Sequence, residues 1–295
     1  MACIQGCSGN NTILQHRYAL RKAMATPQAA APTQRGLMTF DPSHLVVRLA
    51  RDTADLMAAQ HLRYRVFIEE LGGTGPLVDH ANKLECDELD PYFDHLLLVD
   101  TRLNPDDGAH VVGAYRLLPD DRLERTKGFY CDREFDLHAL KSSGRRLLEL
   151  GRSCVATEYR GGPAMLLMWH ALAAYVARSG HEILFGAASF HGTDPHALAQ
   201  PLGLLHHRHL APPELRVRAK VYQRMDMVAP DQLDRKAALA QLPSLIKAYL
   251  RIGGVVGDGA FIDHDFRTTD ICVILDTKVM ARAARSLTPK GSMLP

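Results

Sequence analysis

The stretch LLELGRSCV, Leu147 to Val155, places a glutamate, a glycine and an arginine inside an otherwise apolar run. The apolar residues predict a buried strand. Glycine within a strand often marks a bulge, or a place where a ligand or another backbone comes close. A bulge at Gly151 would shift the alternation of side chains, so that Glu149 and Arg152 could face one cleft. The alternative is a buried ion pair without a further role, which stabilises a fold little.

The segment after this strand predicts a turn into a helix. VATEYRGGPAM (155–165) leads into a run rich in Leu, Met and Ala that ends near Gly180. Gly161 and Gly162 would expose backbone N–H groups at the helix N-terminus, an arrangement that binds phosphate. The alternative is a plain strand-to-helix turn.

Hydrophobic periodicity predicts further elements on both sides of this unit. We expect strands at 45–50, 95–100, 110–118, 182–190 and 270–275, and helices at 52–71, 162–178 and 242–254. The turn-rich segment TRLNPDDGA joins two of the strands into an antiparallel hairpin. The order of elements predicts an α+β (α/β) fold, in which helices cover a mixed sheet.

Length and composition exclude several classes of protein. A chain of 295 residues with 46% hydrophobic residues can bury a large core, and its net charge of +2 does not suggest a nucleic-acid partner. It has no run of about 18 apolar residues that would span a membrane. The six cysteines are scattered, which is typical of a reduced, cytoplasmic setting and predicts no metal site.

Composition along the chain also predicts the domain boundaries. Residues 1–42 lack the apolar region of a signal peptide and include a low-complexity stretch, so we expect a disordered arm. Residues 43–285 are expected to form the folded domain, with an extension from about residue 228, and residues 286–295 a tail.

A group of acidic residues precedes the strand at 95–100. Glu85, Asp87 and Asp90 lie within six positions of the chain, and close like charges cost free energy unless a cation lies among them. Such a pocket would suit a substrate that carries an ammonium group, or a few arginines. The alternative is a solvated acidic loop.

Several motifs together resemble the GNAT superfamily of N-acyltransferases. V-x-x-x-x-R-G-G-x-A (155–164) is similar to the superfamily's glycine-rich loop, which receives the pantetheine phosphates of the acyl donor. R-Y-R-V-F (63–67), E-x-D-x-x-D (85–90), V-G-x-x-R-L-L-P (112–119) and E-L-x-R (149–152) resemble the acyl-homoserine-lactone synthases. This resemblance implies a GNAT-like fold: a mixed, mostly antiparallel sheet flanked by helices, here with a C-terminal helical and strand extension.

A longer resemblance, over about residues 43–285, is to the L-ornithine N-alpha-acyltransferases of bacterial ornithine-lipid synthesis. It includes DHLLLVD, GAASFHGTDP and the block LPSLIKAYLRIGGVVGDGAFIDHDFRTTD, which the lactone synthases lack. It implies direct transfer of a 3-hydroxyacyl chain from acyl carrier protein to the alpha-amine of L-ornithine, giving lyso-ornithine lipid. The only cofactor would be the phosphopantetheine of the carrier, and none would be bound permanently.

Two other functions stay open on the sequence alone. One is an enzyme like the acyl-homoserine-lactone synthases, and the other is a non-catalytic protein that binds an acyl carrier or a lipid. Because the product would be a one-chain amphiphile, contact with the cytoplasmic face of the inner membrane is a further expectation. The apolar stripe at 242–252 would suit such contact but is also typical of a core helix.

The sequence assigns catalytic roles to one strand. Glu149, partly desolvated, would accept the proton of the attacking amine. A backbone N–H freed at Gly151 would stabilise the thioester oxygen, and Arg152 would hold Glu149 or a substrate carboxylate. Cys154 is expected to be a core thiol and not a nucleophile.

Substrate and donor contacts complete the predicted site. For ornithine we expect Arg63, Phe67, Glu85, Asp87, Asp90 and Arg116. The alternative for the charged ones is salt bridges among themselves. For the donor and its acidic carrier we expect Val155, Arg160, Gly161, Gly162, Arg145 and Arg146. Pro163 and Met165 depart from the superfamily's glycine pattern, which implies fewer N–H groups facing phosphate.

Overall fold

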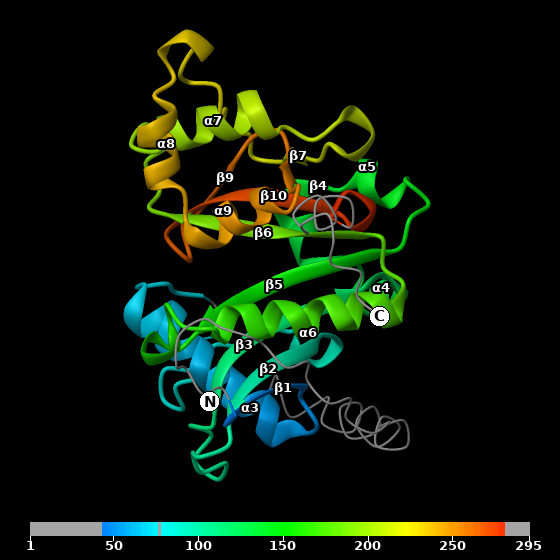
Figure 1. Cartoon of the computed structure of the whole chain (residues 1–295), viewed down its shortest axis with the longest axis vertical. Coiled ribbons are helices and arrows are strands. Elements are labelled where there is room, and N and C mark those ends of the chain that lie inside the picture. Colours follow the sequence, from blue (N-terminus) through cyan, green and yellow to red (C-terminus); the bar gives the residue numbers. More distant parts are fainter. Residues whose placement is uncertain (1–42, 76–77, 281–295) are drawn as a thin grey trace, which may run out of the picture. The chain divides into compact units, whose positions relative to one another are not determined.

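The computed structural model describes residues 43–75 and 78–280. The described residues divide into two compact units: one contains those of 43–116 together with 152–175, and the other contains 117–151 together with 176–280. Three elements pass from one unit into the other (Figure 1): β3 (Val111–Pro119), β5 (Leu147–Val155) and α6 (Ala164–Ser179). The N-terminal arm and the tail expected from the sequence lie outside the described residues.

The first unit is built on four neighbouring strands. They are β1 (Leu45–Leu49), β2 (Asp94–Asp100), most of β3, and the last residues of β5. β1 and β2 are antiparallel, with Leu45 opposite Asp100. Every residue of β2 and β3 is buried, which explains why their sequences are apolar runs without alternation.

The helix expected at 52–71 changes type along its length. The Asp52 side chain accepts a hydrogen bond from the Asp55 N–H (3.0 Å) and begins α3 (Thr53–Arg63). The chain then continues as a π-helical segment, η1 (Tyr64–Glu70). Short π-helical segments often occur at functional sites.

Helices α3 and α6 pack on opposite faces of the strands of the first unit. Tyr175 of α6 donates to Asp94 of β2 (2.7 Å). The next residue, His95, points to the other face and bonds to the Asp90 carbonyl (2.9 Å), while the Asp90 carboxylate accepts from Gln60 of α3 (2.9 Å). In the view of Figure 1, α6 crosses in front of these strands. The 3₁₀ segments of this unit are η2 (Asp90–Tyr92) and η5 (Thr157–Tyr159).

The second unit contains the first residues of β5 and a set of strands from the C-terminal half. Its strands are β6 (Ile183–His191), β8 (Val255–Val256), β9 (Phe261–Asp263), β10 (Thr268–Asp276), and the separate pair β4 (Phe135–Asp136) and β7 (Arg218–Ala219). β5 and β6 are parallel, whereas β10 is antiparallel to β6, β8 and β9. This arrangement confirms the mixed, mostly antiparallel sheet.

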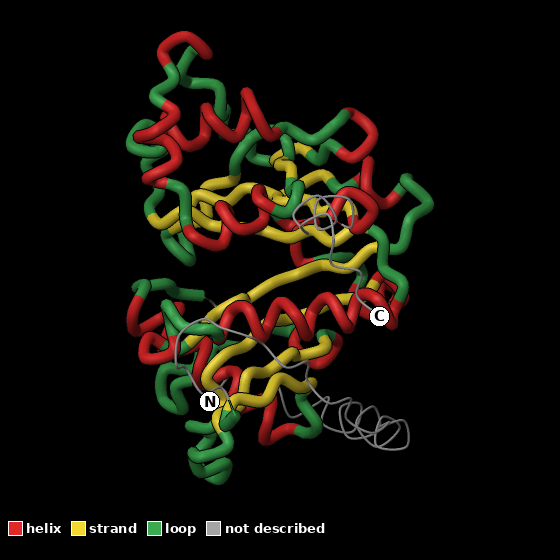
Figure 2. Tube along the Cα trace, viewed as in Figure 1, coloured by secondary structure: helices red, strands yellow, loops and turns green. Residues whose placement is uncertain are grey.

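Helical segments surround these strands (Figure 2). They are α4 (Leu123–Thr126), α5 (His138–Lys141), α7 (Ala199–His209), α8 (Arg235–Gln241), α9 (Ser244–Arg251), and the 3₁₀ segments η3 (Asp120–Arg122), η4 (Tyr130–Arg133), η6 (Pro213–Leu215) and η7 (Pro230–Gln232). Helix α9 contacts β10 and buries Ile246 and Tyr249, so its apolar stripe belongs to the core. Within the described residues, every helix is too short or too polar to cross a bilayer.

Gly186 lets β6 approach β5 closely. A Cβ at this position would lie less than 3.0 Å from the carbonyl oxygen of Leu150. Only glycine fits there without a shift of the backbone. The glycine that begins the segment GAASF (186–190) is therefore required because the strand that carries Glu149 lies so close to it.

Candidate active site

The acidic residues of the first unit are bound to arginines. Arg63, on the last turn of α3, donates to both oxygens of Asp90 (2.8 Å each) and also to Glu85. All three side chains are almost completely buried. Although burial opposes ionisation, the guanidinium groups of Arg63 and Arg116 hold the pKa of Asp90 well below its usual range.

Two further arginines complete this network. Arg116 of β3 donates to Asp87 (2.6 Å) and to Asp90 (2.8 Å). Arg152 of β5 donates from Nε to Glu85 (3.0 Å), and one of its terminal nitrogens lies 3.9 Å from Asp87. Three guanidinium groups therefore face three carboxylates, and their formal charges cancel.

This network changes the interpretation of the predicted ornithine site. Arg63 and Arg116 are 0% and 1% exposed, and their guanidinium groups donate to carboxylates of the chain itself. Glu85 and Asp90 are each 1% exposed and accept from these arginines. The structure shows salt bridges within the group, the alternative considered from the sequence, and ornithine binding by these residues stays a prediction. Phe67 lies on η1 and is half-buried.

The irregularity expected in β5 occurs at Arg152. Its φ is +48°, in the left-handed region that a non-glycine residue rarely adopts. The strand therefore kinks one residue after Gly151. This local backbone turns the Arg152 side chain toward Glu85, the partner that the structure shows, whereas the sequence suggested Glu149 or a substrate carboxylate.

Glu149 is held by the backbone of the second unit. Its carboxylate is 1% exposed and accepts hydrogen bonds from the N–H groups of Tyr130 (2.8 Å) and Cys131 (2.6 Å). Backbone donors of this kind stabilise the ionised form of a carboxylate. Burial and the nearby Glu149 charge raise the pKa of the Cys131 thiol well above its usual value. The structure thus fixes Glu149 as a buried acceptor.

Strand register places other polar residues on the same face as Glu149. Phe185 of β6 is paired with Glu149 on one side and with Ile274 of β10 on the other. Residues two apart on a strand share a face. Cys272 and Asp270 therefore lie on the face that carries Glu149.

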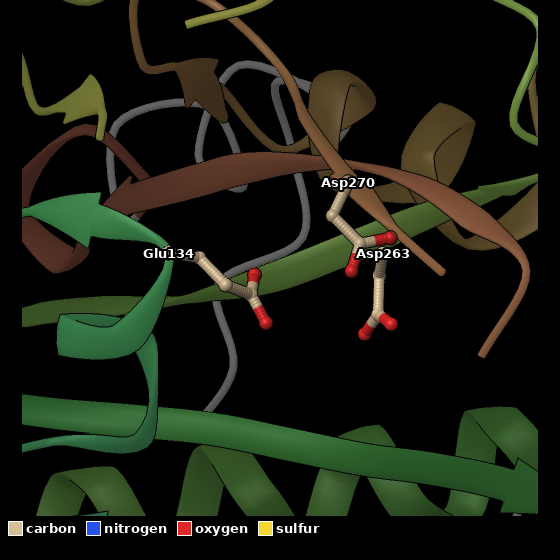
Figure 3. Close-up of side chains that lie close together, drawn as sticks. All are labelled: Glu134, Asp263 and Asp270. Carbon is tan, nitrogen blue, oxygen red and sulfur yellow. The ribbon is translucent and has the colours of Figure 1, made fainter. Parts of the chain in front are cut away.

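Three carboxylates meet on this face, as Figure 3 shows. Glu134 precedes β4, Asp263 ends β9 and Asp270 belongs to β10; one oxygen of each lies within 4.8 Å of the others. Glu134 and Asp270 are each 4% exposed. This group, which we call the carboxylate cluster, was not predicted from the sequence. A signal existed, because Asp270 is a charge at the start of an apolar strand.

The glycine loop borders a cavity of about 570 Å³ within the first unit. Gly161 has a φ of +76° and open space where a side chain would be. The lining includes the loop and the start of α6, together with three arginines: Gly162, Pro163, Ala164, Arg65, Arg102 and Arg160. This combination of a helix N-terminus and cationic side chains is suited to a phosphate group.

Two of the three arginines predicted to bind the acyl donor and its carrier donate hydrogen bonds to carboxylates of the chain. Arg160 donates to the Val155 carbonyl (2.8 Å) and to Glu70 (2.7 Å), and this contact lowers the pKa of Glu70. Arg145 forms a bidentate pair with Asp276 (2.7 and 2.8 Å). Arg145 thus contacts β10 of the second unit through Asp276, and carrier binding by Arg145 stays a prediction.

The remaining predicted residues differ in their exposure. Arg146 donates to the Ser179 carbonyl, yet its side chain is 48% exposed, so it stays available to a partner. Cys154 is buried, and burial raises the pKa of its thiol to about 12. A thiol of this kind is almost entirely protonated at neutral pH, which agrees with the expectation of a core residue.

The fold and the glycine loop define an N-acyltransferase of the GNAT class, and the comparison with known families agrees. The model of the acetyltransferase (GNAT) domain family matches residues 62–170. An L-ornithine N(alpha)-acyltransferase from Rhodobacter capsulatus is 58% identical over 248 residues, which cover 84% of this chain and 96% of the relative. The enzyme of the same name from Brucella abortus is 43% identical, and the aligned region covers 78% of this chain and 84% of the relative. The chain therefore belongs to the L-ornithine N-alpha-acyltransferase family.

Solved structures with a similar fold are more distant in sequence. FeeM, an N-acyl amino acid synthase from uncultured soil microbes, has a TM-score of 0.47 and 12% identity, with 85% of this chain and 98% of FeeM covered. The acyl-homoserine-lactone synthase LasI has a TM-score of 0.45 and 14% identity at the same coverage.

Proposed function

We propose that this chain transfers a 3-hydroxyacyl group from acyl carrier protein to the alpha-amine of L-ornithine, giving lyso-ornithine lipid. L-ornithine is proposed as the acceptor because the relatives of this chain are named L-ornithine N(alpha)-acyltransferases. The proposed mechanism rests mainly on Glu149 of β5, whose buried carboxylate accepts hydrogen bonds from two backbone N–H groups. The reaction is direct aminolysis of the thioester.

The chemistry needs a base because the ammonium form of the amine has no lone pair for attack. Glu149 accepts the proton, directly or through a water molecule, an effect worth about 10²–10⁴ in rate. The nitrogen then bonds to the thioester carbon, the C–S bond breaks, and the leaving thiolate takes up a proton. A backbone N–H near the kink after Gly151 would bind the carbonyl oxygen while its negative charge develops.

The cavity beside the glycine loop supports a donor with a phosphate. A carrier-bound pantetheine has a single phosphodiester, which the N-terminus of α6 and the side chains of Arg65 and Arg102 would meet. An acidic carrier would also be attracted by exposed cations such as Arg146. The donor would arrive in the cytoplasm, and the amphiphilic product would leave at the inner membrane.

The test is an assay with purified components. The protein is incubated with L-ornithine and one of three donors. These are acyl carrier protein loaded with a 3-hydroxyacyl chain, acyl carrier protein loaded with the same chain without the 3-hydroxyl, and the 3-hydroxyacyl thioester of coenzyme A. Mass spectrometry follows the product. We expect acyl-ornithine mainly with the first donor, and loss of product in Glu149→Gln. The exposed Glu124 provides the matched control, since Glu124→Gln should retain the activity.

The outcomes separate the parts of the proposal. Equal rates with 3-hydroxyacyl coenzyme A and with 3-hydroxyacyl carrier protein would overturn the requirement for the carrier protein. Product with S-adenosylmethionine as acceptor, and none with L-ornithine, would instead identify a lactone-synthase-like enzyme. Without acylated product from any donor and acceptor pair, a non-catalytic binding role would replace the enzyme.

A further inference from the structure

The cavity beside the glycine loop has three arginines in its lining, and they differ in how they are held. Arg160 forms an ion pair with Glu70, so its guanidinium is already engaged. Arg65 is exposed and forms no hydrogen bond or ion pair with the residues that the structure describes. Arg102 is fixed by Asp100, yet 62% of its side chain is exposed. Of the three, Arg102 is therefore both positioned and available to a ligand.

Asp100 is the buried anchor of this arginine. It is the last residue of β2, and its side chain is 0% exposed. Its N–H donates to the His110 carbonyl (2.9 Å), which fixes the backbone. The carboxylate accepts from Nε of Arg102 at Oδ1 (3.0 Å) and from Nη2 at Oδ2 (2.7 Å). These hydrogen bonds hold the pKa of Asp100 well below its usual range. An ionised, buried carboxylate thus sets the orientation of an exposed guanidinium.

Asp100 also connects Arg102 to the segment that leads into the glycine loop. The Tyr159 hydroxyl donates to Oδ2 of Asp100 (2.7 Å), the same oxygen that accepts from Nη2 of Arg102. Tyr159 is the last residue of η5, and both Tyr159 and Arg102 line the cavity. One carboxylate therefore fixes a phenol and a guanidinium beside the glycine loop.

The glycine loop lacks one backbone donor. Pro163 lines the cavity directly before the first residue of α6, and proline has no N–H. A helix N-terminus binds an anion through successive backbone N–H groups. An arginine offers donors in a planar fork that matches a phosphate, and the pair with Asp100 uses two of its five N–H groups. Arg102 is thus able to replace the donor that Pro163 does not provide.

We propose that Arg102 binds the phosphate of the donor's pantetheine, and that Asp100 is a positioning residue that holds Arg102 and Tyr159 for this contact. The inference rests on the proposed function and names the side chains that select a phosphorylated donor. Asp100 does not touch the donor and acts through Arg102. Its effect on donor selection should therefore depend on the presence of that arginine.

The experiment compares two donors that differ only in the phosphate. These are the 3-hydroxyacyl thioesters of 4′-phosphopantetheine and of pantetheine, and the ratio of their kcat/KM values at saturating L-ornithine is the phosphate preference. We expect the wild type to prefer the phosphorylated donor. Arg102→Gln should lose about 10-fold in kcat/KM for that donor, mainly through KM, and stay within about twofold of the wild type for the other. Asp100→Asn should lose about 3- to 10-fold in the same way.

Matched controls remove charges that lie outside the cavity lining. Arg208→Gln removes an exposed guanidinium, and Asp106→Asn removes an exposed carboxylate from the turn that carries Arg102. Both should keep the phosphate preference of the wild type. Thermal melts of each variant verify folding. Tyr159→Phe, which removes a single hydroxyl, is a milder change that should reduce the preference by about two- to threefold.

A double variant distinguishes positioning from a general role in packing. If Asp100 acts through Arg102, adding Asp100→Asn to Arg102→Gln should change the phosphate preference by less than about twofold. A loss of packing alone would instead lower kcat/KM for both donors to the same extent.

A second measurement does not need turnover. Isothermal titration of 4′-phosphopantetheine and of pantetheine into the protein should show tighter binding of the phosphorylated compound, and Arg102→Gln should abolish the difference. If the wild type acylates nothing but shows this difference, the proposed function fails while the phosphate site stands. If the wild type acylates L-ornithine and treats both donors alike, the proposed function stands and this inference fails.

Three other results would overturn the inference. An unchanged phosphate preference in Arg102→Gln would remove this residue from the donor site. Equal losses for both donors would assign Asp100 and Arg102 a structural role. A further large loss of preference when Asp100→Asn is added to Arg102→Gln would show that Asp100 does not act through the arginine.

Discussion

Arg152 donates a hydrogen bond from Nε to Oε1 of Glu85 at 3.0 Å, although the two residues are 67 positions apart in the chain. The arginine makes this contact from a backbone with a φ of +48°. Such a conformation costs a non-glycine residue about 1–2 kcal/mol. The contact with Glu85 offsets that cost, because Glu85 would otherwise be a buried carboxylate with one fewer cation.

Replacement of Arg152 separates the strain of its backbone from the loss of its contact with Glu85. Arg152→Ala and Arg152→Gly both remove the cation, but only glycine relieves the backbone strain. We expect both variants to be less stable than the wild type, with Arg152→Gly more stable than Arg152→Ala by about 1 kcal/mol. Urea unfolding, followed by the fluorescence of the single tryptophan, Trp169, measures the difference. Equal stability of the two variants would mean that the kink is not strained.

The pH profile of Glu149→Gln tests the role of the proposed base. The amide can accept only one of the two backbone N–H bonds well, so we expect a loss of about 1–3 kcal/mol in stability. Near neutral pH kcat/KM should fall by about 10²–10⁴. The residual rate should then rise steeply with pH, because the free amine becomes more abundant without help from the enzyme. Parallel profiles for variant and wild type would indicate a positioning role.

Cys154 should be dispensable for the reaction. Burial raises the pKa of its thiol to about 12, so thiolate is scarce at neutral pH. Cys154→Ala should keep kcat within about threefold of the wild type and cost about 1 kcal/mol of stability as a small cavity forms. A covalent acyl adduct on Cys154, detected by mass spectrometry of the intact protein during turnover, would contradict direct aminolysis.

Two glycines should respond differently to alanine. At Gly186 the new methyl group would collide with the Leu150 carbonyl. We expect Gly186→Ala to destabilise the fold by more than about 2 kcal/mol and to reduce activity, because the strand that carries Glu149 must move. At Gly161 the space is open and only the positive φ opposes a side chain. Gly161→Ala should therefore cost only about 1 kcal/mol. Thermal or urea melts of the two variants provide the comparison.

Stability should decrease in two stages as the solution becomes acidic. Burial lowers the pKa of His95 below its ordinary value of 6.5, so from that pH downward the unfolded chain binds the proton more readily than the folded chain does. Stability present above pH 6.5 is therefore lost as the pH falls toward the folded pKa. Despite burial, which acts in the opposite direction, the arginines lower the pKa values of Asp87 and Asp90 below 3.8. A second loss follows when the pH falls below that value.

Urea unfolding at closely spaced pH values measures both stages. His95→Gln, which has no group that titrates in this range, should remove most of the first decrease and leave the second. An unchanged slope between pH 6.5 and 5 in this variant would assign the first stage to other histidines, such as His181, whose pKa is also lowered by burial.

Local patterns in the sequence predicted most of the major elements. The strand at 147–155, the loop around Gly161 and Gly162, and the helix after it occur where the periodicity placed them. Hydrophobic spacing reports which residues of a short segment share a face, and it succeeds where one segment meets one core. The very short strands β4, β7, β8 and β9 were missed because two or three residues show no period.

The candidate site was predicted only in part, because sequence patterns report on short segments and not on contacts between distant ones. Glu149 was recognisable as a carboxylate in an apolar strand, and the structure places it in a niche of backbone donors. The acidic motif at 85–90 was also recognised, but its arginine partners come from three different elements. Sequence spacing does not reveal which distant charge will neutralise which.

The sequence by itself determined the major elements, their order, the glycine loop and the family. Only the tertiary structure decided that Arg152 faces Glu85, that the acid–arginine network is neutral, and that Glu134, Asp263 and Asp270 meet. The physical reason is that helix and strand formation depends on neighbours a few residues apart, whereas the free energy of a buried charge depends on whatever the whole fold brings within a few ångströms of it.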